Sequence, residues 1–277
     1  MNAENFRREA HRMVDWMADY LQDVEKYPVR AQVSPREIFE QLPDEAPVQG
    51  EEMSAIFQDF EKIILPGITH WQSPNFYAYF PANASPPSLL AEMLTATLGA
   101  QCMIWETSPA AAELEEKVTG WLGKLIGIPA EWAGVIQSTA SESTLCALLS
   151  ARERASQFSI NESGFSGKEK YRVYGSSQTH SSIEKGLKIA GLGSNSFVKV
   201  PVDESFAMNP DLLRLLISSD LKEGHTPLAV VASLGTTGST AMDSLEEIGK
   251  ICREHGIWLH VDAAYAGSAF ILPEYQH

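Results

Sequence analysis

The sequence has few cysteines, and they do not form pairs. The 277 residues include three, and no Cys-x-x-Cys motif joins any of them: Cys102, Cys146 and Cys252. An odd number of scattered cysteines excludes a disulfide framework and a zinc site built on cysteine pairs. Unpaired cysteines are typical of a reducing compartment, so we expect a cytoplasmic protein without a bound metal.

Positive charge and long apolar segments are also scarce. Lysine and arginine number 21 against 36 aspartates and glutamates, which gives a net charge of -15. This balance disfavours nucleic acid and anionic membranes as partners. The most apolar long window, 256–272, contains His260 and Asp262 and is a poor membrane span. The charged residues 1–9 lack the apolar core of a signal peptide.

Two nucleotide-binding motifs are missing as well. The sequence contains neither the Gly-rich P-loop that ends in Gly-Lys-Ser/Thr nor the Gly-x-Gly-x-x-Gly fingerprint of dinucleotide sites. It does contain 44% hydrophobic residues, enough for a sizeable core. Its length suits one large α/β domain or two smaller ones.

The first third of the chain predicts helices without strands. Apolar spacing indicates a helix over 4–27, which Pro28 ends, and a second over 51–64, stopped by Pro66-Gly67. Between them, 28–50 is proline-rich and predicts an extended arm with a short turn near 35–41. These helices precede every strand, so they pack either on a partner subunit or on the chain's own large domain; the residues leave both interpretations open.

Two further helices are predicted over 86–100 and 109–127. Ser108-Pro109 supplies an N-cap followed by proline at the first helical position. The second of these helices carries an apolar face that we expect to be buried, formed by Leu114, Val118, Trp121, Leu122 and Leu125.

From residue 132 onward, strands and helices alternate. Short apolar runs predict strands at 134–136, 171–174, 196–200, 228–232 and 257–261. A helix with Leu145, Leu148 and Leu149 inward is predicted after the first strand, and further helical patterns lie over about 181–190, 210–222 and 244–254. Alternation of this kind is typical of βα units on a mostly parallel sheet with helices on both faces.

Polar residues follow four of these strands. They occupy 137–142, 178–182, 235–239 and 260–267, where strand gives way to helix or loop. In open α/β sheets the carboxyl ends of the strands share one edge, and ligands bind there. Each loop alone is more simply explained as a helix cap or a structural turn, but four at one edge indicate a ligand site.

Asp262 suggests which ligand. A carboxylate at the end of a buried strand needs a cationic or hydrogen-bonding partner, because an unpaired buried charge is costly. The small residues Ala263, Ala264, Ala266 and Gly267 after it leave room for a flat molecule. Together with a helix N-terminus at 137–142, which favours one phosphate, the pattern predicts a phosphorylated pyridine whose ring nitrogen lies on Asp262.

At this point the sequence resembles the pyridoxal-phosphate (PLP) group II decarboxylases, in the aromatic-L-amino-acid decarboxylase family. The resemblance covers essentially the whole chain and is carried by five segments: Asn75 to Pro81, Gly134 to Glu142, His180-Ser181-Ser182, Leu234 to Thr237, and His260 to Phe270. It implies the α/β fold of type I PLP enzymes, like aspartate aminotransferase, preceded by an N-terminal helical segment. The expected division is a swapped helical segment at 1–84 and a large PLP-binding domain at 85–277.

The resemblance also implies roles for individual residues. Thr139, Ala140 and Ser141 would hold the phosphate, and Thr237 would lie beside the cofactor. His180 would stack on the ring, Asp262 would pair with its nitrogen, and Ala264 would pack beneath it; His180 and Asp262 are the catalytic candidates. The substrate pocket would be lined by Trp71, Tyr79, Phe80 and Pro81, with Met103 from the partner of a homodimer whose active site lies at the subunit interface.

The implied reaction is decarboxylation of an aromatic L-amino acid to the amine and carbon dioxide. Alternatives are another fold-type-I PLP enzyme (an aldehyde-forming synthase, an aldolase or a transaminase) or a truncated chain that only binds cofactor. Position 103 is Met and position 82 is Ala, where animal members carry an aromatic residue and a threonine. No lysine here has the context of the family's Schiff-base lysine, so we expect the chain to be the N-terminal part of a longer enzyme.

Overall fold

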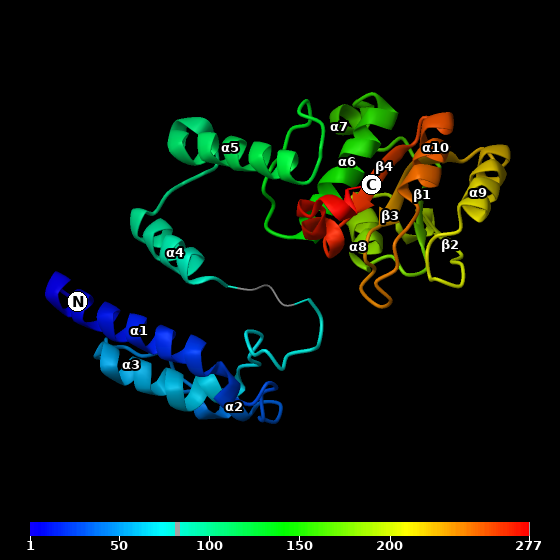
Figure 1. Cartoon of the computed structure of the whole chain (residues 1–277). Coiled ribbons are helices and arrows are strands. Elements are labelled where there is room, and N and C mark those ends of the chain that lie inside the picture. The colour runs from blue at the N-terminus through cyan, green and yellow to red at the C-terminus, as the bar shows by residue number, and fades with distance from the viewer. Residues whose placement is uncertain (81–83, 277) are drawn as a thin grey trace. The chain divides into compact units, whose positions relative to one another are not determined.

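The computed structural model describes residues 1–80 and 84–276 and divides into two compact units, Met1–Gly99 and Ala100–His277. The first unit is helical, and the second is built around a parallel sheet (Figure 1). Two residues singled out in the sequence, Pro81 and Ala82, lie outside the described residues.

The helices of the first unit agree with the predicted ones. Helix α1 spans Ala3–Asp23 and continues as a 3-10 turn, Val24–Lys26. Helix α2, Glu37–Gln41, is the short turn in the proline-rich arm. Helix α3, Met53–Asp59, runs on through a π turn at Phe60–Ile64 and a 3-10 turn at Leu65–Gly67. Helix α4 spans Pro86–Leu98 after a Ser85 capping box.

Aromatic rings form a small core in this unit. Trp16 of α1 stacks on Tyr20, with centroids 5.3 Å apart, and meets Phe57 and Phe60 edge-on. His70 is 2% exposed, and its Nδ1 lies 2.7 Å from the Tyr20 hydroxyl. Burial lowers the pKa of His70, because desolvation disfavours the charged ring.

The second unit follows the predicted alternation of strands and helices. Its strands are β1 (Tyr171–Ser176), β2 (Phe197–Val200), β3 (Thr226–Ser233) and β4 (Trp258–Asp262), all parallel in the order β2-β1-β3-β4. The helices are α5 (Pro109–Leu125), α6 (Ala140–Ser156), α7 (Ser159–Ser163), α8 (Ser182–Ile189), α9 (Pro210–Lys222) and α10 (Leu245–His255).

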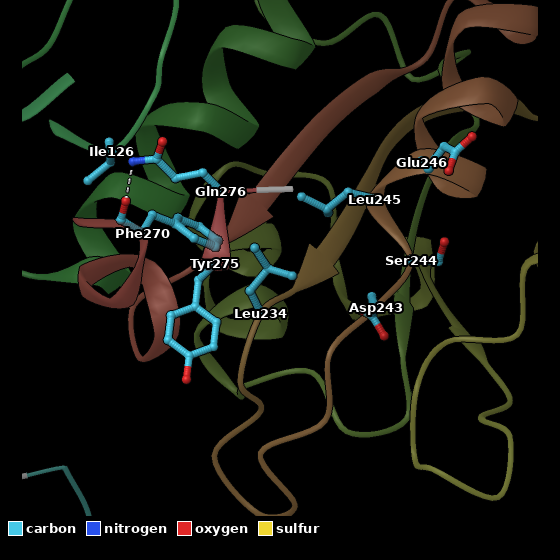
Figure 2. A pocket seen from close by; sticks show the side chains of 9 residues that line it. All are labelled: Ile126, Leu234, Asp243, Ser244, Leu245, Glu246, Phe270, Tyr275 and Gln276. Carbon is cyan, nitrogen blue, oxygen red and sulfur yellow. Dashed lines mark hydrogen bonds between the residues drawn. The ribbon is translucent and has the colours of Figure 1, made fainter. Parts of the chain in front are cut away.

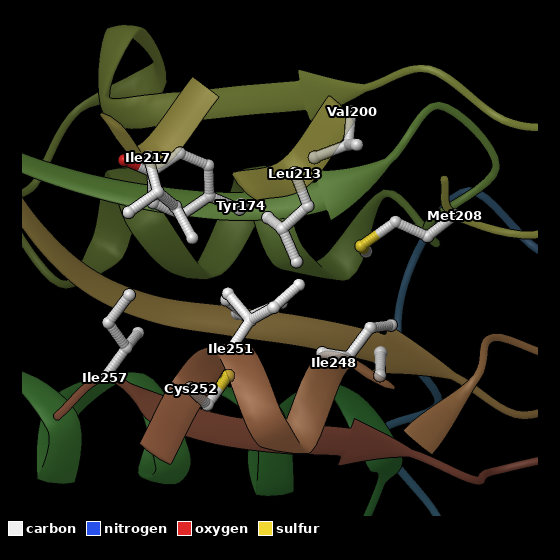
Figure 3. Packing of buried hydrophobic residues seen from close by; sticks show 11 residues of the cluster. Tyr174, Val200, Met208, Leu213, Ile217, Ile248, Ile251, Cys252 and Ile257 are labelled. Atoms are coloured by element: carbon white, nitrogen blue, oxygen red, sulfur yellow. The ribbon is translucent and has the colours of Figure 1, made fainter. Parts of the chain in front are cut away.

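The sheet is covered on both faces, as parallel sheets are. On one face, Val230 and Ala232 of β3 pack against Leu213 of α9 and Ile248 of α10 (Figure 3). On the other, the alternate residues Val173, Ala229 and Val231 pack against Leu148 of α6 and against Ile183 and Leu187 of α8. Successive side chains of a strand point to opposite faces, so these apolar runs supply both cores.

Two predictions for this unit are wrong. Residues 134–136 form no strand, and Val135 and Ile136 are 67% and 63% exposed, because no described strand lies beside them to complete a ladder. The apolar face of α5 is not buried: Leu114, Trp121, Leu122 and Leu125 are 44–60% exposed, and only Val118 is half-buried. These four side chains therefore remain largely uncovered by the described residues of this unit.

The carboxyl-terminal part of this unit consists of short turns. After β4 the chain forms 3-10 turns at Ala266–Ile271 and Pro273–Tyr275. Gln276 then donates to the carbonyl oxygens of Leu125 and Phe270, at 2.8 and 2.6 Å. Across residues 1–80 and 84–276, no helix has both the length and the hydropathy of a membrane span.

Candidate active site

The carboxyl ends of three neighbouring strands meet at one edge of the sheet. Strand β1 ends at Ser176, β3 at Ser233 and β4 at Asp262, and the register sets Ser233 directly beside Asp262. The predicted polar segments 178–182, 235–239 and 260–267 therefore lie at a common edge, as parallel strands require.

The fourth segment begins helix α6. Thr139 is its N-cap: the Thr139 hydroxyl accepts the Glu142 N–H at 3.2 Å. The first backbone bonds of the helix come from Glu142 and Ser143 to the Thr139 carbonyl oxygen. The N–H groups of Ala140 and Ser141 therefore point out of the helix end, where N–H dipoles and the helix dipole favour an anion.

A hydrogen bond fixes this helix end relative to β4. The Thr144 hydroxyl lies 3.3 Å from Nε2 of His260, and Thr144 is 2% exposed. From Thr144 back to Ala140 is about 6 Å of helix, and from His260 on to Asp262 is about 6.6 Å of strand. The start of the helix and Asp262 are thus each only about 6–7 Å along the chain from this one shared contact.

His260 itself is held in its neutral form. Burial lowers the pKa of His260 against the smaller opposing effect of Asp262, whose negative charge raises it. A neutral ring suits a hydrogen bond to a threonine hydroxyl, because one ring nitrogen then accepts and the other donates.

The Asp262 carboxylate is half-buried and only partly bonded. Its Oδ1 accepts the N–H of Ala264 at 3.2 Å, while Oδ2 receives no hydrogen bond from any residue the structure describes. Ala264, with its single methyl, keeps the space beside this carboxylate open. The arrangement leaves one carboxylate oxygen for a donor outside the chain.

The ring of His180 is exposed but fixed in orientation. The backbone N–H of Ser182 donates to its Nδ1 at 3.2 Å, and the Ser182 hydroxyl lies 2.9 Å from the same atom. Because Nδ1 accepts, the ring proton of the neutral form is on Nε2. A fixed, flat ring at the strand edge can stack on a planar ligand.

The loop after β3 contains one buried threonine and one exposed threonine. Thr236 is 3% exposed, accepts the Ala241 N–H and shares a 2.7 Å hydrogen bond with Ser239. Thr237 is exposed, so its hydroxyl can contact a ligand. Gly235 has φ 83, and a Cβ there would overlap the Tyr265 ring, so the loop requires glycine.

Asp243 supports this loop through hydrogen bonds to backbone N–H groups. Its carboxylate accepts the backbone N–H of Ser233 at 2.7 Å and that of Met208 at 2.6 Å, and burial raises its pKa. It lines a hollow of about 510 Å³ with Leu234 and Phe270 (Figure 2). The N-cap of α10 is Ser244, so the Asp243 carboxylate bonds to the backbone near this loop and does not cap the helix.

The predicted substrate residues fall in both units. In the first, Trp71 stacks on Phe76 and on Tyr79, with centroids 4.7 and 5.6 Å apart. Phe80 follows, 39% exposed, and Pro81 lies outside the described residues. Met103 belongs to the second unit and is 73% exposed. The structure brings Trp71 and Tyr79 together as one aromatic surface.

Comparison with known proteins identifies the class. Residues 35–277 match the pyridoxal-dependent decarboxylase conserved domain, and the chain belongs to this family. The resemblance and the fold class inferred from the sequence are confirmed, and so is the expected cofactor, pyridoxal phosphate.

Individual relatives are similar over the whole chain. It is 46% identical to phenylacetaldehyde synthase of Petunia hybrida and 44% identical to tyrosine decarboxylase 1 of Narcissus pseudonarcissus, covering 56% and 55% of those proteins. The crystal structure of Catharanthus roseus tryptophan decarboxylase with L-tryptophan matches at a TM-score of 0.94 and 43% identity; the match covers 100% of this chain and 60% of that one. The chain thus spans about half the length of the curated relatives it matches.

The residues at the strand edge fit this cofactor chemically. The N–H groups at the start of α6 suit a phosphate, the open Asp262 oxygen suits a protonated ring nitrogen, and the exposed His180 ring suits a planar face. Sequence reasoning missed the Thr144–His260 bond. The spacing of the residues could have indicated this contact. Thr144 lies one helical turn after Ala140, and His260 lies on the same face of its strand as Asp262.

Proposed function

We propose that the complete gene product uses pyridoxal phosphate to decarboxylate an aromatic L-amino acid, giving the amine and carbon dioxide. The observation that carries this proposal is the Asp262 carboxylate, one of whose oxygens has no hydrogen bond among the described residues. The bond between Thr144 and His260 ties the start of α6 to the same strand. The two groups supply the charges that opposite ends of the cofactor need.

The proposed roles of the residues follow from their chemistry. Thr139, Ala140 and Ser141 bind the phosphate at the helix end. His180 stacks on the ring, Thr237 lies beside it and Ala264 packs beneath it. Asp262 holds the proton on the ring nitrogen, because a nearby carboxylate favours the charged form. Bound there, the cofactor supplies an electron sink for the pair left when carbon dioxide departs.

The aromatic preference rests on the predicted pocket wall. Trp71, Tyr79, Phe80 and Pro81 offer rings and apolar surface, and Met103 adapts to different ring shapes. Segments 71–82 and 101–108 contain no lysine or arginine to receive a side-chain carboxylate. An acidic substrate would lose its hydration there without a partner, which disfavours glutamate and aspartate.

A second candidate reaction forms an aldehyde from the same substrates. Two similarities favour it: the 46% identity to the Petunia phenylacetaldehyde synthase, and a TM-score of 0.93 at 40% identity to 4-hydroxyphenylacetaldehyde synthase of Rhodiola rosea. Both reactions begin with a bound aromatic amino acid, so the residues described here serve either.

We also propose a cytoplasmic homodimer, with the helices of segment 1–84 swapped onto the partner and the active site at the subunit interface. The exposed apolar face of α5, with Leu114, Trp121 and Leu122, supports it, since so large an apolar surface is typical of an interface. The free thiols of Cys102 and Cys146 are compatible with a reducing compartment.

Product analysis tests the reaction. The complete gene product, loaded with pyridoxal phosphate, is given phenylalanine, tyrosine, tryptophan and glutamate, and the products are separated. We expect an amine and carbon dioxide from the aromatic substrates. An aldehyde would support the second candidate, and absence of turnover of every aromatic substrate would reject both.

A further inference from the structure

Ser233 carries a buried hydroxyl without a hydrogen-bond partner. It is the last residue of β3 and is 3% exposed, and its Oγ bonds to nothing among residues 1–80 and 84–276. Its backbone N–H, by contrast, is held by Asp243 at 2.7 Å. Burying a hydroxyl without a partner costs free energy, so such an atom in an otherwise well-bonded sheet calls for a reason.

The register places this hydroxyl beside Asp262. Ser233 and Asp262 are paired residues of adjacent parallel strands. They point to the same face, because Val231 and Trp258, which stand an even number of residues before them, pack in the same core. Paired backbones lie about 4.8 Å apart, so a rotation of the Ser233 side chain brings its hydroxyl within hydrogen-bond reach of the carboxylate.

Asp262 has the capacity to accept this bond. Its Oδ1 takes the Ala264 N–H, and no described group donates to Oδ2. A carboxylate accepts several hydrogen bonds, so a ring N–H and a serine hydroxyl can both be bound.

We propose that Ser233 is a positioning residue for Asp262, whose hydroxyl donates to Oδ2 of that carboxylate when the cofactor is bound. The proposal rests on the proposed role of Asp262 toward the ring nitrogen. The Ser233 hydroxyl, which has no partner among the described residues, would then be bonded to the carboxylate. The bond keeps the carboxylate turned toward the ring and favours its charged form.

The test compares Ser233→Ala and Ser233→Thr with a matched buried serine. Ser196 is 6% exposed and donates to the Gly193 carbonyl oxygen at 2.7 Å, in the turn before the amino end of β2. For each variant of the complete gene product, the melting temperature without cofactor and the affinity for pyridoxal phosphate are measured.

Opposite patterns are expected for the two serines. Ser233→Ala keeps or raises the cofactor-free melting temperature, because it removes an unpaired polar group, and binds pyridoxal phosphate about tenfold more weakly. Ser233→Thr retains the hydroxyl and restores the affinity. Ser196→Ala lowers the melting temperature and leaves the affinity unchanged.

Two results would overturn the role of Ser233. One is wild-type cofactor affinity in Ser233→Ala; the other is a fall in its cofactor-free melting temperature like that of Ser196→Ala, which would make the hydroxyl structural. An Asp262→Ala arm separates this from the proposed function. If Asp262→Ala binds the cofactor weakly while Ser233→Ala binds it normally, only the inference is removed. Normal binding and turnover in Asp262→Ala would remove both the inference and the proposed function.

Discussion

Thr144 and His260 join helix α6 to strand β4 through a hydrogen bond of 3.3 Å between Oγ1 and Nε2. Thr144→Val removes that bond while keeping the shape of the side chain. We expect a loss of about 1 kcal/mol in the free energy of unfolding. Cofactor affinity should also fall, because the helix end proposed to bind the phosphate is no longer fixed relative to Asp262. Denaturant unfolding and cofactor titration measure the two effects.

Thr119→Val is the control for this change. The Thr119 hydroxyl donates to the carbonyl oxygens of Glu115 and Glu116 in its own helix and bonds to no other described element. Cofactor affinity should therefore remain at the wild-type value in Thr119→Val. Equal affinities in both variants would show that the bond to His260 does not position α6.

The proposed phosphate site gives a second prediction. The double change Thr139→Ala and Ser141→Ala removes both hydroxyls from the start of α6. Cofactor retention should weaken by a few kcal/mol at most, since charge-assisted hydrogen bonds contribute roughly 1.5–3 kcal/mol each. The Ala140 N–H remains, so binding is reduced and not abolished. Cofactor occupancy after dialysis measures the change.

The lost N-cap of Thr139 also lowers stability, so the control is another N-cap. Asn209 caps α9 by accepting the Leu212 N–H at 3.1 Å. Asn209→Ala should cost a similar amount of stability, about 1 kcal/mol, without loss of cofactor. Unchanged occupancy in the double variant would place the phosphate elsewhere.

His260 makes stability depend on pH. Burial lowers the pKa of His260, so the folded chain binds a proton there less readily than the unfolded chain does. Stability from this residue is therefore present above the unfolded pKa of about 6.5 and falls as the pH drops through the folded pKa. The loss on acidification from about pH 7 to about pH 5 should be smaller in His260→Gln.

Burial also lowers the pKa of His70 in the first unit, so His70 too should reduce the stability of the chain as the pH falls. Unfolding curves of His260→Gln and His70→Gln, recorded at both pH values, separate the two contributions. The prediction for His260 fails where its variant loses as much stability on acidification as the wild type.

Local patterns predicted much of this fold because βα units are built from contacts close in the sequence. The four strands and the helices after them were placed within a few residues, since apolar runs such as 228–232 between turn residues are typical of strands buried on both faces of a sheet. The common strand edge followed from parallel topology, and Asp262 from its place at the end of a strand.

Features that depend on distant neighbours could not be predicted this way. Residues 134–136 have the composition of a strand, but a strand exists only with a partner, and none of the described strands lies beside it. The face of α5 is apolar, but periodicity does not say what covers it. The orphaned Ser233 hydroxyl depends on which atoms surround it and leaves no trace in the sequence.

A buried tyrosine joins the inner strand β1 to helix α9. Tyr174 is 0% exposed and donates to Oδ2 of Asp220 at 2.7 Å, while Nε of Arg172 donates to Oδ1. Tyr174→Phe leaves the half-paired Asp220 buried and should cost about 1–3 kcal/mol of unfolding free energy. Tyr171→Phe, in the same strand but with no described hydrogen bond from its hydroxyl, should cost much less in the same denaturation experiment.

Substrate choice is the fifth prediction. In side-by-side competition, tryptophan, tyrosine or phenylalanine should be consumed far faster than glutamate, because the proposed pocket has no cation for a side-chain carboxylate. Met103→Ala should change the preference among the aromatic substrates and leave cofactor affinity intact. Glutamate or aspartate outrunning every aromatic substrate would reject the pocket assignment.

Strand β4 is the last strand in the order of the described sheet, with β3 on one side only. Beside it lies an apolar hollow of about 710 Å³ whose lining includes Leu259, Val261 and Ile257. A bare strand edge next to apolar surface is a template on which an extended segment of another molecule can pair. A polypeptide of these 277 residues alone should therefore aggregate as its concentration rises, even at temperatures at which it stays folded. Light scattering should rise with protein concentration well below the melting temperature, and a dilute sample should stay clear.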